Sequence, residues 1–341
     1  MPVVNPPISI ASSADEQVLD LALRPTSLAE YIGQAKVKQN LNILIGAARK
    51  RNEPLEHILI HGPSGLGKTT LAHIIAKQMG VGLKMTSGSA LEKAGDLGSI
   101  LTGLGEGDCL FIDEVHRLNR AVEEMLYPAM EDFKLDIVIG KGNSAKTLQI
   151  ELPRFTLIAA TTKIAMLASP FRSRFGVNYK LDFYEPDEMQ AIVARSANLL
   201  GIKSEPVALR AIADSARFTP RIANRLLKRV RDYAQMESAE TISADLARKA
   251  LALLEIDSLG LEATDRRILE IIAAKFAGGP VGLKTVAAMI GEDEDTIADV
   301  HEPYLLRIGF LARTSRGRVI TSDGAKHVGV TLDHDPQALL L

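Results

Sequence analysis

The chain has 341 residues, a formal net charge of −2 and a hydrophobic fraction of 46%. This length is too great for one ordinary core and predicts two or three domains. The balanced charge excludes a strong overall basic field, and the single cysteine, Cys109, excludes a disulfide framework and fits a reducing compartment. Because no apolar run reaches the length of a membrane span, we expect a cytoplasmic protein with no membrane partner.

The two ends of the chain differ from its middle. Residues 1–14 contain prolines and serines but no cationic start before an apolar block, which predicts a flexible tail and not a signal peptide. A second short tail is expected over residues 337–341. Between the tails, the regions 15–184, 185–256 and 257–336 differ in pattern and are predicted to be separate domains.

Residues 15–184 alternate apolar runs with helical patterns, as a parallel α/β sheet with helices should. The predicted strands cover residues 58–61, 109–113 and 156–160, and charged or hydroxyl residues follow each one. Since open α/β sheets bind ligands at the carboxyl ends of their strands, these residues are candidates for a binding site. Residues 135–139 and 146–152 alternate around a turn at 140–145 and predict an inserted β-hairpin.

The run HGPSGLGKTT, residues 61–70, lies between the first predicted strand and a helical pattern. A strand, a glycine-rich turn and a helix in this order are the context that a phosphate-binding P-loop requires. Lys68 would supply charge to the β- and γ-phosphates, Thr69 would offer a hydroxyl to Mg²⁺, and the helix adds the positive end of its dipole. The chain is therefore predicted to bind a nucleoside triphosphate, whose phosphates can approach the backbone N–H groups closely at Gly62, Gly65 and Gly67.

Asp113 and Glu114 end the second predicted strand. Such a pair can hold Mg²⁺ through Asp113 and orient an attacking water through Glu114, which favours an ATP hydrolase over a nucleotide-binding switch. The tetrapeptide DEVH is also the acidic box of another helicase superfamily, so it does not define the family alone. The hydroxyls of Thr161 and Thr162, after the third strand, can contact the water or the γ-phosphate, although threonine is common at strand ends.

Two arginines, Arg172 and Arg174, lie in an otherwise apolar turn after the third predicted strand. An intramolecular ion pair would explain them, and so would an arginine finger that stabilises charge during phosphoryl transfer. Arg174 comes far after the P-loop, on the next element of the sheet, which favours contact with the nucleotide of a neighbouring subunit. That second interpretation requires an oligomer.

The middle region, residues 185–256, has a wholly helical pattern and predicts a small helical domain. Its helices are expected to begin near residues 187, 206 and 220, the last two at prolines, which are favoured at the first position of a helix. We expect a mostly solvated basic face on the third helix, formed by Arg221, Arg225, Lys228, Arg229 and Arg231.

From residue 257 the pattern restarts with helices near 264–275, 283–290 and 295–308 and short strands at 310–313 and 318–321. Three helices and a hairpin predict a winged helix-turn-helix, an architecture that reads DNA. From residue 258 onward nine lysines and arginines oppose twelve carboxylates, a net charge of −3 that is not typical of a DNA-binding domain. Residues 303–322 nevertheless hold four arginines and no carboxylate, which favours local phosphate contacts. Winged helices also bind proteins, and that alternative stays open.

The order of these motifs, ending with Pro220 and Arg221, is similar to that of the AAA+ ATPases, and the phrases around them resemble the RuvB family of Holliday-junction branch-migration motors. Three positions depart from the family pattern. Ser64 and Lys163 replace a usual proline and arginine and are expected to have little effect, whereas Glu294 stands where some members carry a DNA-contacting arginine, so that contact is not transferred. The resemblance covers roughly residues 15–330, with similar phrases at 23–25, 31–34, 62–70, 110–118, 131–133, 170–176, 219–225, 302–305, 309–311 and 313–318.

For the nucleotide site, the resemblance implies ATP or ADP with Mg²⁺, held by Thr69 and Asp113, at each boundary between subunits. Arg174 would act on the neighbour's nucleotide, and Arg221 would contact the γ-phosphate in its own subunit. The remaining roles fall to the adenine and ribose contacts Leu23, Arg24 and Tyr184, the phosphate contacts Gly62, Gly65, Gly67, Lys68, Thr69 and Thr70, the boundary residues Glu131, Asp132 and Phe133, and the catalytic residues Lys68, Glu114 and Thr162.

For partners, the resemblance implies a homohexameric ring that translocates duplex DNA at a four-way (Holliday) junction during recombination and repair. RuvA would dock on the hairpin at 135–152, the junction resolvase RuvC would join the complex, and the wing would contact DNA phosphates through Arg313, Arg316 and Arg318. Two other functions stay open. A protein-remodelling AAA+ machine would need an exposed aromatic in a pore loop, but residues 93–98 are polar and small. An ATP-switched transcription regulator would suit the winged helix but would make poor use of Glu114 and Arg174.

Overall fold

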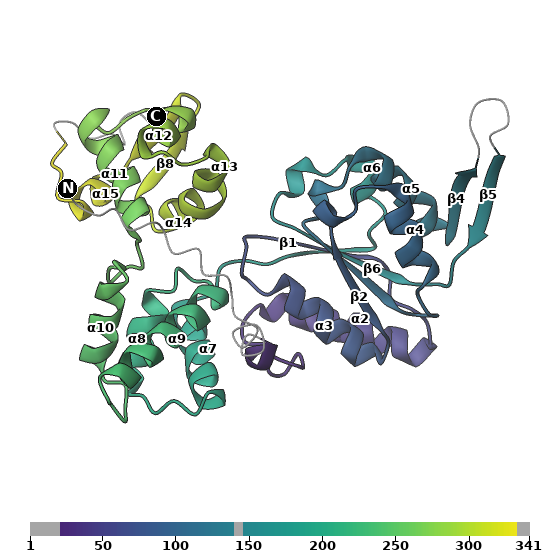
Figure 1. Cartoon of the computed structure of the whole chain (residues 1–341), viewed down its shortest axis with the longest axis horizontal. Coiled ribbons are helices and arrows are strands. Elements are labelled where there is room, and N and C mark those ends of the chain that lie inside the picture. The colour runs from purple at the N-terminus through teal and green to yellow at the C-terminus, as the bar shows by residue number, and fades with distance from the viewer. Residues whose placement is uncertain (1–20, 140–145, 333–341) are drawn as a thin grey trace. The chain divides into compact units, whose positions relative to one another are not determined.

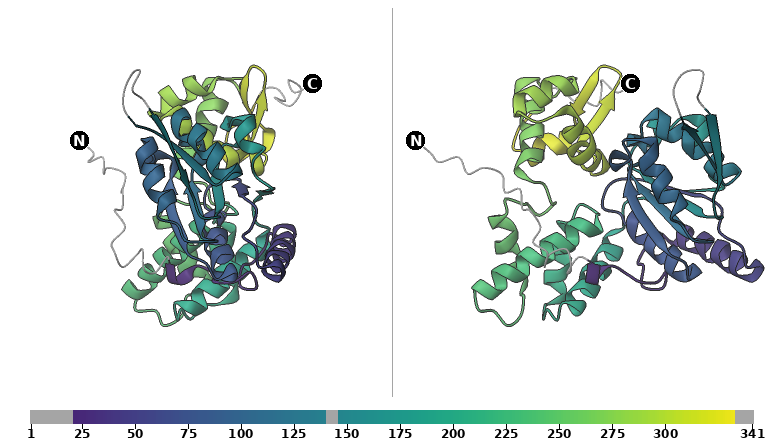
Figure 2. Two further views of the ribbon diagram at one scale, coloured as in Figure 1. Left: turned by 90° about the vertical axis from the view of Figure 1, so that its right-hand side faces the viewer. Right: turned by 45° about the vertical axis from the view of Figure 1, so that its right-hand side comes forward.

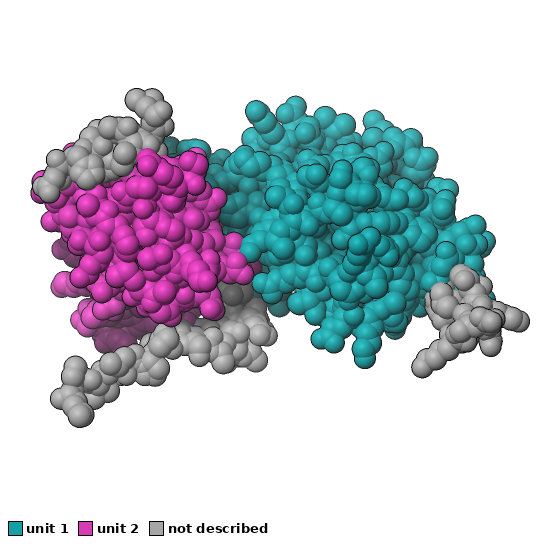
Figure 3. Space-filling model, turned by 90° about the horizontal axis from the view of Figure 1, so that it is seen from above, with its two compact units in different colours: residues 1–188 teal, residues 189–341 magenta. Residues whose placement is uncertain are grey.

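The computed structural model describes residues 21–139 and 146–332 (Figure 1, Figure 2). The chain divides into two compact units, residues 1–188 and 189–341, which Figure 3 shows in teal and magenta. The predicted tails at 1–14 and 337–341 and the hairpin turn at 140–145 lie outside the described residues. Within the described ranges, no helix combines the length and the apolar character needed to cross a membrane.

The first unit is built on a five-stranded parallel sheet with the strand order β2-β3-β6-β1-β7. The three strands predicted from apolar runs form its centre, where almost every side chain is buried. The sequence pattern does not predict the two edge strands, because an edge strand needs no continuous apolar run and both are largely half-buried or exposed. The strands are β1 (Ile58–His61), β2 (Leu83–Ser87), β3 (Cys109–Asp113), β6 (Thr156–Thr161) and β7 (Val177–Lys180).

Helices cover both faces of this sheet, α2 and α3 on one side and α4 and α5 on the other (Figure 1). Since β1, β3 and β6 are parallel, their carboxyl ends meet at one edge, where His61 pairs with Thr161. That edge carries the glycine loop, the acidic pair and the two threonines. The helices are α2 (Ala35–Arg51), α3 (Lys68–Met79), α4 (Ala94–Thr102), α5 (Arg120–Glu131) and α6 (Ser169–Arg172), with short 3₁₀ turns η1 (Gly88–Ala90), η2 (Val115–Arg117) and η4 (Ile164–Met166).

A two-stranded antiparallel hairpin, β4 (Lys134–Ile139) and β5 (Lys146–Glu151), extends from the first unit (Figure 1). Its ladder runs from the pair Lys134 and Glu151 to the pair Ile139 and Lys146. Leu135 is fully buried in the core of the unit, so the base of the hairpin is anchored there. The predicted inserted hairpin is confirmed.

The second unit starts within α7 and first forms a group of four helices, one more than the three whose starts the sequence predicts. Ser243 begins the fourth helix by accepting a hydrogen bond from the backbone N–H of Leu246. The exception on the mostly solvated basic face expected for α9 is Lys228, which is 6% exposed because it borders the buried stripe of the helix that contains Leu227. The helices are α7 (Pro186–Leu199), α8 (Pro206–Asp214), α9 (Pro220–Met236) and α10 (Ala244–Leu253).

The rest of the second unit is a winged helix, as predicted. The helix predicted over residues 295–308 is found as one continuous helical run from residue 294 to 307, interrupted only by a π-helical turn before Pro303, which has no N–H to continue the helical ladder. Leu269, Ile272 and Ile320 lie in the core of this domain. Its elements are α11 (Ala263–Lys275), α12 (Leu283–Ile290), α13 (Glu294–Thr296), the π-helix η5 (Ile297–His301), α14 (Glu302–Arg307), β8 (Leu311–Thr314), β9 (Gly317–Ile320) and α15 (Ser322–His327).

Candidate active site and basic wing

The loop between β1 and α3 requires its glycines. Gly62 and Gly67 have φ values of 144° and 101°, in a region that other residues rarely adopt. A Cβ atom would lie 2.4 Å from the carbonyl oxygen of Leu181 at Gly62, and 2.6 Å from the hydroxyl of Tyr31 at Gly67. Gly65 has a φ of 79°. These three residues therefore let the backbone take a curled path that a side chain would prevent.

Lys68, the first residue of α3, turns back into this loop. Its Nζ donates hydrogen bonds to the carbonyl oxygens of Gly62 at 2.8 Å and Pro63 at 2.9 Å, and the residue is 6% exposed. Thr69 and Thr70 follow, half-buried, in the first turn of the helix. A buried ammonium, a helix N-terminus and two hydroxyls together form a site suited to an anion.

Two tyrosines support the loop from behind. The hydroxyls of Tyr31 and Tyr184 both donate hydrogen bonds to the carbonyl oxygen of Leu66, at 3.0 and 3.1 Å. Burial raises the pKa of Tyr31 well above its ordinary value and the pKa of Tyr184 to about 12, so both remain neutral donors. Sequence reasoning assigned no role to Tyr31, because its partner lies 35 residues away. Of the other residues predicted to contact the adenine and ribose, Leu23 is buried and Arg24 is half-buried.

The acidic pair and the threonines meet at the carboxyl ends of β3 and β6. Glu114 has a φ of 45°, and its Oε2 accepts hydrogen bonds from the backbone N–H of Thr162 at 3.2 Å and from its hydroxyl at 3.0 Å. Asp113 precedes it, and its Oδ1 accepts the Glu114 N–H at 3.0 Å. His116 joins them: its Nδ1 lies 3.2 Å from Oε2 of Glu114 and 2.9 Å from the hydroxyl of Thr161. No role for His116 is predicted from the sequence.

Arg174 lies just after α6 and contacts α5 of its own chain. Its Nε is 3.2 Å from Oε1 of Glu131, and its guanidinium carbon is 4.1 Å from the centre of the Tyr127 ring. Its Nη1 donates to the carbonyl oxygen of Pro170 at 2.5 Å. An ion pair within the chain is therefore present, which leaves the finger role open. Tyr127 was missed, although its spacing of four residues from Glu131 places both on one helix face.

The other predicted boundary residues follow Glu131 directly. Asp132 caps the end of α5, and Phe133, with a φ of 53°, packs edge-on against Phe155 at 5.9 Å between ring centres. Arg221 belongs to the second unit, where it is exposed in the first turn of α9.

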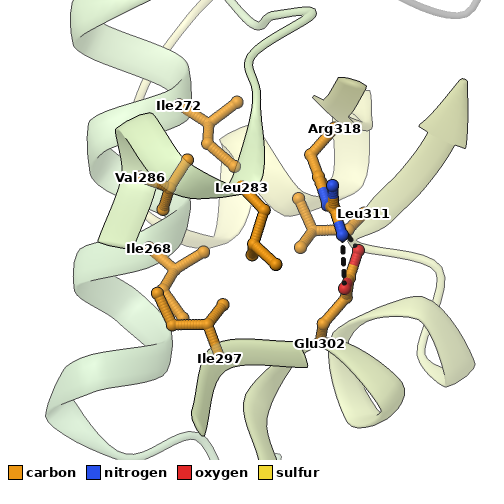
Figure 4. Close-up of a pocket in the computed structure, with 8 residues that line it drawn as sticks. All are labelled: Ile268, Ile272, Leu283, Val286, Ile297, Glu302, Leu311 and Arg318. Carbon is orange, nitrogen blue, oxygen red and sulfur yellow. Dashed lines mark hydrogen bonds and ion pairs between the residues drawn. The ribbon is translucent and has the colours of Figure 1, made fainter. Parts of the chain in front are cut away.

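In the wing, one buried carboxylate holds two of the three predicted DNA-contacting arginines. Glu302 is 1% exposed, and its two oxygens accept hydrogen bonds from Nε and Nη2 of Arg313 at 3.0 and 2.7 Å and of Arg318 at 2.8 and 3.1 Å. Burial alone would raise the pKa of Glu302, but the hydrogen bonds from both arginines outweigh it and lower the pKa. Glu302 and Arg318 lie at the edge of a small recess that is otherwise apolar (Figure 4).

The two arginines differ in access. The Arg313 side chain is 57% exposed and that of Arg318 is 20% exposed, whereas Arg316 is exposed at the turn of the hairpin. Each guanidinium uses Nε and Nη2 on Glu302, so its Nη1 edge is left for other partners. The cluster of Glu302, Arg313 and Arg318 has a net charge of +1. The stretch without carboxylates, residues 303–322, is thus neutralised in part by the residue that precedes it.

Family models match three consecutive segments of the chain. They describe the P-loop domain of the Holliday junction DNA helicase RuvB at residues 23–181, the RuvB AAA lid domain at 184–257 and the RuvB C-terminal winged helix domain at 258–329. The chain belongs to the RuvB family. Holliday junction branch migration complex subunits RuvB from two strains of Chloroflexus aurantiacus are each 56% identical to it over 328 residues, 96% of this chain and 93% of theirs.

Solved structures agree with this RuvB assignment. The Thermotoga maritima RuvB Holliday junction branch migration motor matches with a TM-score of 0.84 and 48% identity, covering 91% of this chain and 99% of that chain. The Aeropyrum pernix ORC2 protein, at 16% identity and a TM-score of 0.53, shares the fold alone. As a RuvB family member, the chain is an AAA+ P-loop ATPase with a lid and a winged helix, a helicase-type motor. Family membership favours branch migration over protein remodelling or transcription regulation.

Proposed function

We propose that the chain forms a homohexameric ring which hydrolyses ATP to translocate duplex DNA at a four-way junction, with RuvA, during recombination and repair. The observation that carries this proposal is the succession of the three RuvB domains in one chain, with the P-loop, the acidic pair and an arginine-bearing wing all present. RuvC would join the complex for resolution of the junction. Because the substrate is DNA, we place the activity in the cytoplasm, without a membrane partner.

In this proposal the curled loop holds the nucleotide phosphates through Gly62, Gly65, Gly67, Lys68 and Thr70. Thr69 and Asp113 offer the hydroxyl and carboxylate oxygens that Mg²⁺ prefers, and both lie at the carboxyl edge of the sheet. When bound there, the metal would offset charge on the phosphates. Leu23, Arg24 and Tyr184 would line the adenine and ribose.

Glu114 would accept a proton from the attacking water. Its carboxylate is 30% exposed and is held by two hydrogen bonds from Thr162, so Thr162 can report on the occupied site by releasing or keeping this contact. Arg174 would reach the nucleotide of the neighbouring subunit across a boundary lined by Glu131, Asp132 and Phe133. Arg221 would contact the γ-phosphate of its own subunit and couple its loss to the lid.

The hairpin β4–β5 would dock RuvA, and the wing would follow the DNA backbone through Arg313, Arg316 and Arg318. Phosphate contacts of this kind hold DNA without reading its sequence, which suits a motor. The pairing with Glu302 reduces the freedom of Arg313 before DNA binds, so less side-chain entropy is lost on contact.

The test is ATP-dependent dissociation of a synthetic four-way junction with and without RuvA. We expect the wild type to move the junction in the presence of RuvA, and the double variant Arg313→Ala/Arg316→Ala to lose this movement. The variant Arg267→Ala/Lys275→Ala removes the same charge from exposed positions on α11 and should retain it. ATP hydrolysis without junction movement by the wild type would overturn the proposed function.

A further inference from the structure

The loop between α8 and α9 of the lid enters the winged helix through Arg217. This residue is 4% exposed, and its Nη2 donates a hydrogen bond to Oδ1 of Asp265 on α11 at 3.1 Å. Asp265 is 0% exposed. The same Nη2 lies 3.4 Å from the carbonyl oxygen of Val300 in the π-helix. A charged side chain of the lid is therefore almost fully enclosed by two elements, α11 and η5, of the winged-helix domain, called the head below.

Aromatic contacts surround this ion pair. The guanidinium carbon of Arg217 lies 4.7 Å from the centre of the Tyr304 ring, and the Phe218 ring lies 6.0 Å from the same ring. Arg307 of α14 covers the Phe218 ring at 5.7 Å. Arg217 and Phe218 thus both pack against the head, and they do so from adjacent positions in the chain.

The carboxylate that receives Arg217 is itself fixed. Nδ1 of His301 lies 2.7 Å from Oδ1 of Asp265, and the backbone N–H of Glu262 donates to Oδ2 at 2.8 Å. Asp265 therefore links the start of α11 to the π-helix. Because each of its oxygens has a partner in the head, it cannot follow a shift of Arg217 without breaking contacts there.

The lid side of the contact is equally constrained. Arg217 and Phe218 both have a φ of 54°, a left-handed conformation that costs residues with side chains free energy and persists only where the surroundings impose it. The hydroxyl of Thr219 donates to the carbonyl oxygen of Arg217 at 3.0 Å. Two residues later comes Arg221, in the first turn of α9. The short segment from the buried ion pair to Arg221 is therefore held in one conformation.

We infer that Arg217 is a positioning residue that joins the lid and the winged helix into one lever, so that a displacement of Arg221 during the ATP cycle is carried to the DNA-binding head. A buried ion pair adds little net stability compared with apolar packing, but its geometry is directional and resists sliding. An apolar contact at the same place would keep the domains together without fixing their angle. This inference rests on the proposed roles of Arg221 and of the wing.

The experiment compares full-length hexamers with RuvA on a four-way junction and measures ATP hydrolysed and junction movement in the same reaction. Arg217→Met keeps a side chain of similar length and removes the charge. Because this change leaves Asp265 charged and buried, a second variant, Arg217→Met/Asp265→Asn, removes both charges. Asp265 has no part in ATP binding or DNA contact in the proposed function, so both measurements remain interpretable.

We expect both variants to hydrolyse ATP at a rate close to the wild type and to move the junction about tenfold less per ATP, the size of a typical coupling between sites. The control Arg210→Met breaks a pair with Asp214 inside the lid and should keep the wild-type ratio. A wild-type ratio in the doubly neutral variant, or a parallel loss of hydrolysis and movement, would overturn the role of Arg217. If the wild type itself fails to move the junction, the proposed function fails instead.

Discussion

Two arginine–carboxylate pairs, one in each unit, have similar distances and opposite surroundings. Arg174 and Glu131 are 3.2 Å apart, with side chains 20% and 55% exposed. Arg217 and Asp265 are 3.1 Å apart, with side chains 5% and 0% exposed. The first pair is open to water on the carboxylate side, so Glu131 is hydrated if Arg174 leaves it, although Arg174 also contacts the Tyr127 ring and the Pro170 carbonyl oxygen. The second is enclosed, and neither partner can leave without a buried charge remaining.

The difference indicates what each arginine is suited to do. Exposed pairs contribute about 0–1 kcal/mol, whereas removal of one partner from a buried pair costs about 3–5 kcal/mol. An arginine that exchanges a carboxylate of its own chain for a phosphate of a neighbour must be held weakly. An arginine that joins two domains must be held strongly. Mutation of the two residues should therefore separate catalysis from stability.

The largest effect is expected at the weakly held arginine. Arg174→Ala should lower ATP turnover by about 10³-fold, because charge on the transferred phosphoryl group loses its cationic partner. Its melting temperature should stay close to that of the wild type. Both quantities are measured on the purified protein, by steady-state phosphate release and thermal unfolding, with Arg172→Ala as the control for an exposed arginine in the same turn.

An experiment that mixes two kinds of variant subunit tests whether Arg174 acts across the subunit boundary. Lys68→Ala subunits lack a competent P-loop but retain Arg174, so they should restore turnover to neighbouring Arg174→Ala subunits. No recovery at any mixing ratio would contradict action on a neighbour. A melting temperature that falls with turnover would mean that the pair with Glu131 is structural.

The next effect is expected at the strongly held pair. Asp265→Ala should destabilise the second unit by about 3–5 kcal/mol, because it leaves the Arg217 charge buried without its carboxylate. Glu131→Ala, the matched change in the first unit, should cost about 0–1 kcal/mol. Hydrogen exchange of peptides from α9 and α11 measures the loss of stability in Asp265→Ala locally. Equal protection in Asp265→Ala and the wild type would show that the enclosed pair contributes no more than the exposed one.

The parts that the sequence predicts well are those whose signal is local. The P-loop, the acidic pair and the strands β1, β3 and β6 each occupy a few consecutive residues with a distinctive pattern. The wing is predicted for the same reason, from two short apolar runs around a turn. For Arg221 the family resemblance added a predicted role, which its surroundings in the sequence do not reveal.

The parts that escape prediction depend on contacts between distant residues. Tyr31 reaches a carbonyl 35 residues away, and Arg217 reaches a carboxylate 48 residues away. Glu302 directly precedes the stretch without carboxylates, yet only the fold brings it between Arg313 and Arg318. Contacts of this kind follow no periodicity or fixed spacing in the sequence, because the packing of the elements determines which residues meet.

The wing is intermediate between these two pairs, because its buried carboxylate, Glu302, binds arginines that are partly exposed. The smallest effect of mutation is expected here. The pKa of Glu302 is lowered below its ordinary value of 4.5 in the folded protein. Its ion pairs therefore contribute stability above the unfolded pKa, and this contribution is lost as the pH falls through the folded pKa. Glu302→Gln should destabilise the winged helix by about 1–3 kcal/mol near neutral pH, and the difference from the wild type should shrink on acidification.

Hydrogen exchange of peptides from α14 to β9, followed from about pH 6 to about pH 3.5, measures this difference locally. The control Glu270→Gln affects an exposed carboxylate that pairs with Arg267 at 3.4 Å, and should match the wild type throughout. A pH-independent difference between Glu302→Gln and the wild type would mean that packing around the side chain, and not its charge, stabilises the wing. A difference that grows on acidification would contradict the lowered pKa, since it would mean that the folded protein binds the Glu302 proton more tightly than the unfolded chain does. A difference that shrinks on acidification, as expected, would place the stability contributed by the Glu302 ion pairs between that of the exposed pair at Arg174 and that of the enclosed pair at Arg217.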